Sequence, residues 1–423
     1  MTPNSKEAEE SNPKILSGLM LIILFVSMGQ SVYWQTMPII GREFNFSEIE
    51  INTLVSISAA MFIVFTPFWG RLSDRIGRKA VLLIGLSGYV LSNLIFLYSA
   101  SLGLIGYVTG FSLLMILLMA RIVNSAIGAA SRPASGAYVA DVTSEEDRSS
   151  GMGKFGAANN IGTILGPVLV GSLVGLNIFG INIPQFGLLT PLIVMSILMA
   201  MAAVFVYIFL PSGDSVSEAE TNGSGIVFDR NLKLLLAIGV IIFTAFALVQ
   251  SITAFYIQDR FAYNLDETAK TTALLLGTMA FMAIISQLTI VQKYKGSPLN
   301  LIKYSLPLFI LSCLFIIFSP NFLFLYAGMA FMGLGMGLAS PGYTSAASLN
   351  ADKDKQGAAV GLAMVAPGIG FALGPLLSGF LYSSSMNLPF IFILPLFLLI
   401  IVVIRKLEYI NKIKVSGIWR TNY

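Results

Sequence analysis

The segment GTILGPVLVG at residues 162–171 recurs as GFALGPLLSG at residues 370–379, with its three glycines and its proline at the same spacing. Both copies lie in long apolar runs, which predicts a duplicated membrane protein with one glycine-rich helix in each half. Glycines four residues apart clear one stripe of a helix and let a neighbouring backbone approach closely. Packing alone would explain a single copy, whereas two matched copies favour an interface that moves. The candidate gating residues here are Gly162, Gly166, Pro167, Gly374 and Pro375.

The composition indicates that the bilayer is the solvent of most of the chain. Of 423 residues, 56% are hydrophobic and 11% are charged, and the mean hydropathy is +0.82. A soluble protein of this length could not bury so much apolar surface, so we predict an all-α integral membrane protein. The one cysteine, Cys313, cannot form an intramolecular disulfide. The polar start does not read as a cleavable signal, because the apolar run after it is too long.

Hydropathy predicts twelve transmembrane helices, each near the roughly 20 residues that cross a bilayer core. A long polar insert at residues 211–230 predicts a flexible linker between two pseudo-symmetric six-helix bundles. The expected domains are a cytoplasmic tail at 1–14, a bundle at 15–210, a cytoplasmic linker at 211–231, a bundle at 232–406 and a cytoplasmic tail at 407–423. The expected spans are 15–40, 51–70, 80–101, 111–140, 150–175, 188–210, 232–258, 268–291, 300–319, 321–349, 357–382 and 387–405.

Basic residues predict the orientation. With both termini in the cytoplasm, most of the 25 lysines and arginines fall in cytoplasmic segments, and the outer segments hold only Arg42, Arg260 and Lys270. This is the bias expected of an inner-membrane protein with several spans. The net charge of +4 is therefore a topology signal and does not indicate nucleic-acid binding. Nothing in the sequence requires more than a monomer.

Two arginines, Arg121 and Arg132, remain within the fourth expected span. In a continuous helix their spacing of three turns would put them on nearly the same face. Arg132 is nine residues from Asp141, or roughly 13 Å along a helix, close to the bilayer centre. A charge at that depth is costly unless it faces a polar cavity or a partner. We take both arginines as candidate substrate-binding residues; the alternative is a structural arginine bound to helix-end carbonyls beside Pro133.

The chain contains no histidine, and no carboxylate lies in the middle of an expected span. Proton-coupled transporters usually keep such a group in the membrane. If an ion gradient drives the protein, with protons the expected ion, coupling would use edge groups such as Asp141 or the substrate itself. The same absences leave little from which to build nucleophilic or metal chemistry, so we expect no enzyme, no metal site and no cofactor.

The segment GRLSDRIGRK, from Gly70 to Lys79, connects the second and third expected spans. It resembles the signature loop of the major facilitator superfamily, and the resemblance covers about residues 15–405. RIVNSAIGAA at 121–130 is similar to the fourth-helix motif, with Ser125 where the family usually has glycine. AYVADVT at 137–143, followed by Arg148, resembles the end of helix four in drug and tetracycline–proton antiporters. The 162–171 segment resembles the antiporter motif of helix five.

A latch on the cytoplasmic side follows from the charges of this loop. Asp74 can face the amino-terminal end of a helix from the other half, near residues 356–361, where the helix dipole favours a carboxylate. Arg78 can pair with Asp141. For Arg75 and Lys79 we favour a role in topology and contact with anionic lipid. The candidate gating residues of the latch are Gly70, Asp74, Gly77, Arg78 and Asp141.

The resemblance implies that helices one, four, seven and ten line a central cavity. Side chains on those helices would give it an amphipathic wall, although any one of them is more often an interhelical hydrogen bond. Arg132 adds a preference for anions, because a guanidinium matches carboxylate geometry. The expected wall residues are Gln30, Tyr33, Trp34, Gln35, Arg132, Tyr138, Gln250, Thr253, Tyr256 and Tyr343.

These features predict a secondary transporter that moves a small organic molecule, anionic or amphipathic, by alternating access. The antiporter-like helix favours export. Uptake of a siderophore or organic acid, or multidrug efflux, is the alternative. A membrane-embedded enzyme or a non-transporting receptor fits the sequence less well.

Overall fold

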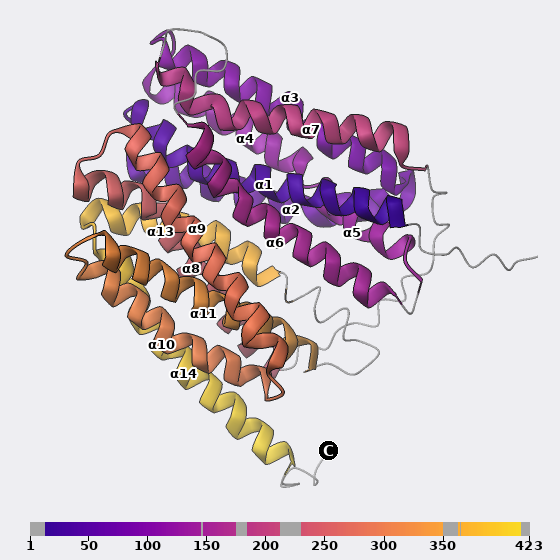
Figure 1. Cartoon of the computed structure of the whole chain (residues 1–423), viewed down its shortest axis with the longest axis vertical. Helices are drawn as coiled ribbons and strands as arrows, with labels where there is room; N and C mark the ends of the chain where they lie inside the picture. The colour runs from indigo at the N-terminus through magenta and orange to yellow at the C-terminus, as the bar shows by residue number, and fades with distance from the viewer. Residues whose placement is uncertain are drawn as a thin grey trace, which may run out of the picture. The chain divides into compact units, whose positions relative to one another are not determined.

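The computed structural model describes residues 13–144, 147–174, 184–211, 230–349, 363 and 365–415, and every regular element in these ranges is a helix (Figure 1). The α-helices are α1 (Pro13–Glu43), α2 (Glu48–Ile76), α3 (Arg78–Leu104), α4 (Gly110–Gly128), α5 (Ser131–Asp141), α6 (Arg148–Leu173), α7 (Thr190–Phe209), α8 (Arg230–Phe261), α9 (Leu265–Thr289), α10 (Pro298–Ile317), α11 (Phe322–Leu349), α13 (Val365–Ser384) and α14 (Leu388–Val415). Two short 3-10 helices, Pro184–Leu189 and Val291–Lys293, precede α7 and follow α9.

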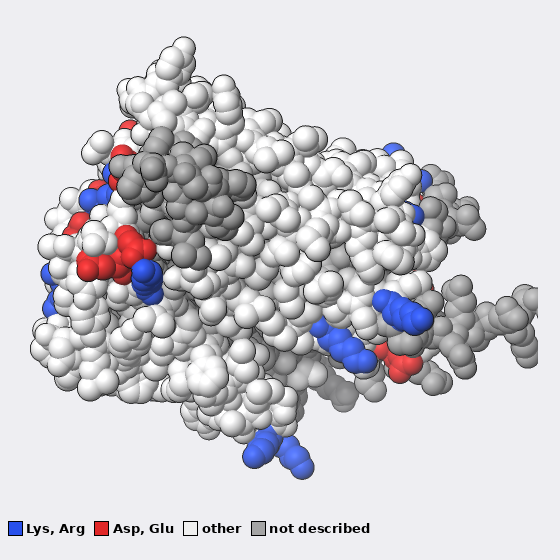
Figure 2. Space-filling model, turned by 45° about the horizontal axis from the view of Figure 1, so that its top comes forward, with Lys and Arg blue, Asp and Glu red and all other residues white. Residues whose placement is uncertain are grey.

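Eleven helical segments of the described chain are long and apolar enough to span a membrane, one fewer than the twelve predicted. The difference is α6, the expected span at 150–175. Its 26 residues reach about 39 Å, enough for a bilayer core of ~30 Å. Glycines and the pair Asn159 and Asn160 lower its hydropathy. On the face shown in Figure 2, charged side chains are few and most of the described surface is uncharged.

The fourth expected span is not one continuous helix. Pro133 has no amide hydrogen and its ring collides with the carbonyl four residues earlier, so α4 ends at Gly128 and α5 begins at Ser131. The Ala130 amide donates to the Ile127 carbonyl, 3.0 Å away. That change frees the Ala126 carbonyl, which accepts a hydrogen bond of 2.6 Å from the indole Nε1 of Trp69 on α2.

Helix ends elsewhere follow local signals. Ser47 caps α2 through a reciprocal bond with Glu50, whose side chain accepts from the Ser47 amide at 2.8 Å. α2 and α3 are joined by Gly77 alone, with φ 93° and ψ 148°, a conformation that only glycine adopts at low cost. α14 continues to Val415, past the end expected at residue 405.

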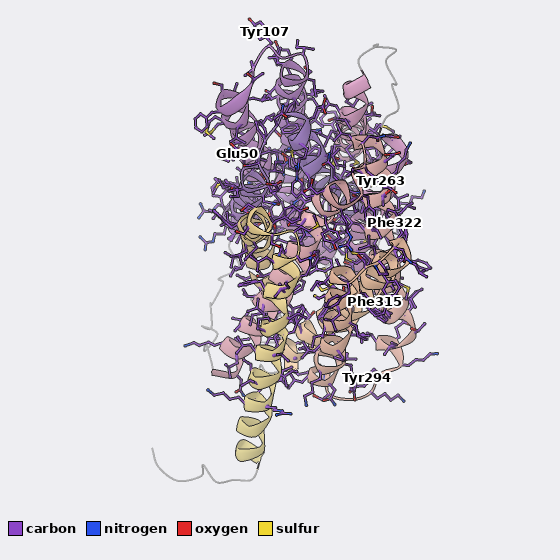
Figure 3. All side chains as sticks on the ribbon, turned by 90° about the vertical axis from the view of Figure 1, so that its left-hand side faces the viewer. Glu50, Tyr107, Tyr263, Tyr294, Phe315 and Phe322 are labelled. Atoms are coloured by element: carbon purple, nitrogen blue, oxygen red, sulfur yellow. The ribbon has the colours of Figure 1, made fainter. Side chains whose placement is uncertain are left out.

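The chain divides into two compact units, Met1–Thr221 with Ile257–Leu274 and Asn222–Tyr256 with Leu275–Tyr423. In the first unit α1 lies along α6, and in the second α10 lies along α11 (Figure 1). Figure 3 labels Tyr294, just before α10, and Phe322, the first residue of α11, which lie beyond opposite ends of α10. Phe309 on α10 stacks on Phe397 on α14, with ring centroids 5.0 Å apart. The expected linker lies almost wholly outside the described residues.

Candidate functional site

Arg121 is a buried cation held by an aromatic ring and an amide. Its guanidinium carbon lies 3.2 Å from the centroid of the Tyr33 ring, and its Nη1 donates to Asn124 Oδ1 at 2.7 Å. Asn124 in turn donates to Ser92 Oγ on α3, 2.8 Å away. With 6% of its surface exposed, Arg121 is the one charged side chain that is buried in the part of the chain that the structure describes. Its partners are neutral, so its charge is not balanced by a carboxylate there.

Arg132 occupies the first turn of α5 and is half-buried. Its guanidinium donates to Asn159 Oδ1 on α6, and the same oxygen accepts a 2.7 Å hydrogen bond from Ser27 Oγ on α1. One amide oxygen therefore joins α1, α5 and α6. Among the described residues the hydrogen-bond acceptor of Arg132 is this side-chain amide, and not the helix-end carbonyl considered as the alternative. No ion pair links Arg132 to a carboxylate within the described ranges.

The break between α4 and α5 changes the relation expected between the two arginines. They lie on separate helices, so a common face does not follow from their spacing. Arg121 is fixed beside α1 and α3, whereas Arg132 is fixed to α6. The first unit thus presents two cationic positions rather than one paired site.

The second half of α1 and the first half of α2 contain buried polar groups without hydrogen-bond partners among the described residues. Neither amide atom of Gln35 nor of Asn52 has a partner, although these residues are 4% and 0% exposed. The hydroxyls of Tyr33 and Ser56 also lack one. A buried amide without a partner is costly, so such groups are candidates for binding a polar ligand or water. Sequence reasoning named Gln35 and Tyr33 but missed Asn52 and Ser56, which are polar residues one turn apart on α2.

Several other expected wall residues already have intramolecular partners. The hydroxyls of Tyr256 and Tyr343 donate to the Ile316 and Ala363 carbonyls, each at 2.9 Å. Tyr138 and Thr253 likewise donate to the Pro211 and Val249 carbonyls, at 2.6 and 2.8 Å. The tyrosine hydroxyls connect separate segments, which leaves their rings as the parts that could contact a substrate, whereas the Thr253 bond stays within one turn of α8. Gln30, Trp34 and Gln250 are half-buried.

Tyr343 is also fixed through its ring. The Phe243 ring meets it edge-on at 6.0 Å, and the Gly239 backbone approaches so closely that a Cβ there would lie 2.5 Å from the Tyr343 ring. Tyr256 meets Phe390 in the same edge-on manner at 5.3 Å. Both tyrosines therefore belong to the packed interior of the second unit.

The predicted ion pair between Arg78 and Asp141 is present. Arg78 Nε donates to Asp141 Oδ2 at 2.9 Å, and Arg78 Nη1 pairs with Asp74 and donates to Ser73 Oγ at 2.8 Å. Arg78 thus connects the end of α2 with the end of α5. The helix end expected opposite Asp74, near residues 356–361, lies outside the described residues.

The structure also shows the surroundings of two further residues of this loop, Gly70 and Lys79. A Cβ added to Gly70 would meet only the Pro133 ring, at 3.9 Å, so the described packing does not demand glycine there. Lys79 is not left to lipid alone: its ammonium donates to the Leu210 carbonyl at 2.6 Å and lies 5.9 Å from the centre of the Tyr207 ring. Lys79 therefore fastens α3 to the end of α7.

In each unit the first two glycines of the repeat pack closely against one neighbouring helix, which is α1 for α6 and α8 for α13. On α6, a Cβ at Gly162 would strike the Leu24 carbonyl, and one at Gly166 would lie 2.6 Å from Ser31 Cβ on α1. On α13, a Cβ at Gly374 would lie 2.7 Å from Ala247 Cβ on α8. Pro167 and Pro375 lie within these helices.

Serines reinforce both of these contacts. Ser31 Oγ donates to the Thr163 carbonyl at 2.8 Å, and Ser251 Oγ lies 2.7 Å from Ser378 Oγ. The repeat therefore has a structural counterpart within each unit.

Sequence reasoning missed an ion-pair cluster in the first unit. Arg42 Nη2 lies 2.5 Å from Glu48 Oε1 and 2.8 Å from Asp259 Oδ2. These contacts tie the end of α1 to the start of α2 and to the end of α8. The available signal was a basic residue and two acidic residues at the ends of three spans, on the side expected to be extracellular.

Comparisons with known proteins give the same assignment as the motifs. The family model described as Major Facilitator Superfamily matches residues 19–302 and 299–420. The chain is 26% identical over 393 residues to Multidrug resistance protein 2 of Bacillus subtilis, with 88% of this chain and 90% of that protein covered. It is 24% identical to the class H tetracycline resistance protein of Pasteurella multocida, over 87% of this chain and 89% of that protein.

Solved structures agree on the fold. The nucleoside transporter NupG superposes with a TM-score of 0.72 at 13% identity, over 94% of this chain and 99% of that one. A bacterial homologue of the human lysosomal transporter Spinster superposes with a TM-score of 0.70 at 15% identity, over 90% and 84%. The chain is a multi-pass membrane transporter rather than an enzyme, and it belongs to the major facilitator superfamily.

Proposed function

We propose that this transporter exports small amphipathic organic molecules and prefers anionic ones. The observation that carries the preference is the pair Arg121 and Arg132, whose partners among the described residues are neutral. A cation within a membrane span is costly unless a counter-charge reaches it. An anionic substrate would supply that charge, and a guanidinium can bind a carboxylate through two parallel hydrogen bonds.

The direction of transport rests on the relatives. The two compared above are named for multidrug and tetracycline resistance, which supports export. These names also favour a second candidate, multidrug efflux, in which the aromatic residues and the unpaired amides of Gln35 and Asn52 bind varied compounds without a charge preference. Uptake of a siderophore or organic acid is the weaker alternative.

Proton coupling is part of the proposal. No Asp or Glu is buried among the residues that the structure describes. The coupling proton would therefore travel on an edge carboxylate, with Asp141 the first candidate because Arg78 holds it at the end of α5. Alternatively, a weakly acidic substrate would carry the proton itself.

The architecture proposed for this cycle is twelve spans in two six-helix bundles that rock about a midplane site. α6 would be the twelfth span. The repeated α6 and α13 contacts support the pseudo-symmetry, and the distribution of basic residues supports an inner-membrane protein with both termini in the cytoplasm. A monomer suffices for this mechanism.

Transport into inverted vesicles tests the proposal. With a pH gradient imposed, we expect accumulation of amphipathic organic anions by the wild type and a much smaller accumulation by Arg132→Gln. Neutral and cationic drugs serve as matched substrates in the same vesicles. If Arg132→Gln moves anions as well as the wild type does while drugs of any charge accumulate, multidrug efflux replaces the anion preference.

A further inference from the structure

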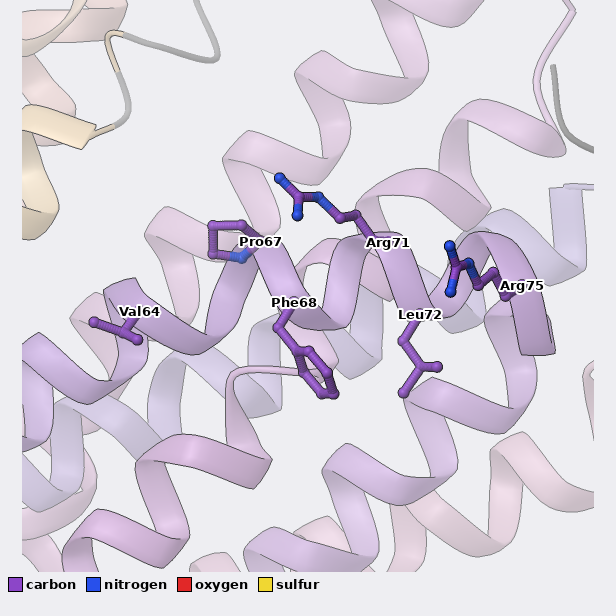
Figure 4. Close-up of a pocket in the computed structure, with 6 residues that line it drawn as sticks. All are labelled: Val64, Pro67, Phe68, Arg71, Leu72 and Arg75. Carbon is purple, nitrogen blue, oxygen red and sulfur yellow. The ribbon is translucent and has the colours of Figure 1, made fainter. Parts of the chain in front are cut away.

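A pocket of about 390 Å³ lies on α2, near the end of the helix that leads into the Gly77 connection (Figure 4). The lining residues that the structure describes come from α2, with apolar side chains towards the middle of the helix and the two arginines towards its end. They are Val64, Pro67, Phe68, Arg71, Leu72 and Arg75. Spacings of three and four residues put them on one side of the helix.

The two arginines of the pocket differ from the other basic residues nearby. Arg78 is bound by Asp74 and Asp141, and Lys79 is bound by the Leu210 carbonyl. Arg71 and Arg75 are exposed and have no ion pair or hydrogen bond through their side chains with any described residue. Two unpaired guanidinium groups one helical turn apart are close enough to bind the same anion.

The apolar part of the pocket indicates that the ligand has an apolar group as well as a negative charge. Val64 and Phe68 are 63% and 54% exposed, and they lie on the side of Arg71 that leads towards the middle of the span. Val64 is seven residues from Arg71, or about 10 Å along the helix axis. A soluble anion would use only the arginines. A ligand with an anionic head and an apolar chain would use the whole pocket.

We propose that this pocket binds one anionic phospholipid, with its phosphate between Arg71 and Arg75 and an acyl chain along Phe68 and Val64. The membrane itself supplies this ligand at high local concentration, and the expected cytoplasmic position of Arg71 and Arg75 places them at headgroup depth. The sequence predicted that Arg75 contacts anionic lipid without defining a binding site. The pocket adds Arg71 and a position for the acyl chain.

Trp69 provides the reporter for a test. Its ring centroid lies 5.2 Å from that of Phe68, and its indole is fixed to the Ala126 carbonyl. Trp34→Phe and Trp419→Phe leave Trp69 as the single tryptophan of the three in the chain. This protein is placed in nanodiscs that contain brominated phosphatidylglycerol or brominated phosphatidylcholine at equal mole fraction, and tryptophan quenching is recorded.

We expect brominated phosphatidylglycerol to quench Trp69 at much lower mole fractions than brominated phosphatidylcholine does. Arg71→Gln with Arg75→Gln should weaken that preference by about thirtyfold, because each basic residue near the surface contributes about a factor of five. Arg405→Gln with Lys406→Gln removes the same charge from the end of α14 and should leave the preference unchanged.

Two results would overturn the proposal. One is equal quenching by the two lipids in the parent protein. The other is quenching by phosphatidylglycerol that excess inorganic phosphate abolishes, which would assign the arginines to a soluble anion. If the glutamine variant does not insert, Arg71→Lys with Arg75→Lys takes its place: retained charge with weakened bidentate binding should lower the preference only in part, and no change at all would count against a phosphate held between the two guanidinium groups.

Discussion

The guanidinium carbon of Arg121 lies 3.2 Å from the centre of the Tyr33 ring, so a buried charge on α4 rests on an aromatic face of α1. The Phe96 ring meets the Tyr33 ring edge-on, with centroids 5.3 Å apart. A desolvated contact of this kind contributes about 2 kcal/mol, which is a large share of the stability of most proteins. The first prediction follows from it.

Tyr33→Leu should destabilise the protein by about 2 kcal/mol or more, because it removes the aromatic face beneath a buried cation. Tyr33→Phe is the matched control and should be close to the wild type, since the Tyr33 hydroxyl has no partner among the described residues. Thermal unfolding in detergent measures both. Equal losses for the two variants would mean that the hydroxyl, and not the ring, is the important group.

The partner of Arg132 gives a second prediction. Asn159→Asp should keep the link to Ser27 and Arg132 while it neutralises the guanidinium. We expect anion transport to fall by about tenfold or more, because the substrate would then compete with a fixed carboxylate. Transport of a neutral drug in the same vesicles should change little. An Asn159→Asp protein that moves anions at the normal rate would show that Arg132 does not receive the substrate.

The Arg78 cluster predicts an unequal set of losses. Arg78→Gln should destabilise the protein more than Asp141→Asn, because Arg78 binds both Asp74 and Asp141. The pair is partly exposed, so its coupling energy in a double-mutant cycle should be only about 0.5 to 1 kcal/mol. Unfolding temperatures of the two single variants and the double variant give this value. Strict additivity would indicate that the ion pair is energetically neutral.

Replacing glycines on α6 by alanine tests whether close contact with α1 requires glycine at a particular position. Gly166→Ala should cost about 1 to 3 kcal/mol, because the new methyl would lie 2.6 Å from Ser31 Cβ. Gly156→Ala on the same helix has no atom within 4 Å of the new Cβ and should be neutral or slightly stabilising. Thermal unfolding again provides the measurement. Ser31→Gly should recover part of the loss in the Gly166→Ala protein, and a failure to recover would point to strain in α6 itself.

Much of the fold could be predicted because bilayer solvation leaves a direct mark on the sequence. Long apolar runs gave the helices, and the Gly70–Lys79 loop and Asp141 gave an ion pair that the structure contains. The hydropathy of α6 alone is a weak signal for a membrane span. The two asparagines and the glycines that pack against α1 lower it. Beyond that ion pair, the partners of the polar side chains within the spans could not be predicted. The hydroxyls of Tyr256 and Tyr343, for example, donate to backbone carbonyls of other segments. Such contacts depend on how segments pack and cannot be read from the sequence.

The break at Pro133 affects how a rotation of α5 is transmitted to α4. A continuous helix passes a twist from one end to the other through its ladder of hydrogen bonds, but here two turn residues, Ala129 and Ala130, separate α4 from α5. At this turn the Ala130 amide bonds to the Ile127 carbonyl, so the ladder between Asp141 and Arg121 is interrupted at one place. We therefore expect Arg132 to be able to reorient with α5 while Arg121 and Tyr33 keep their contact.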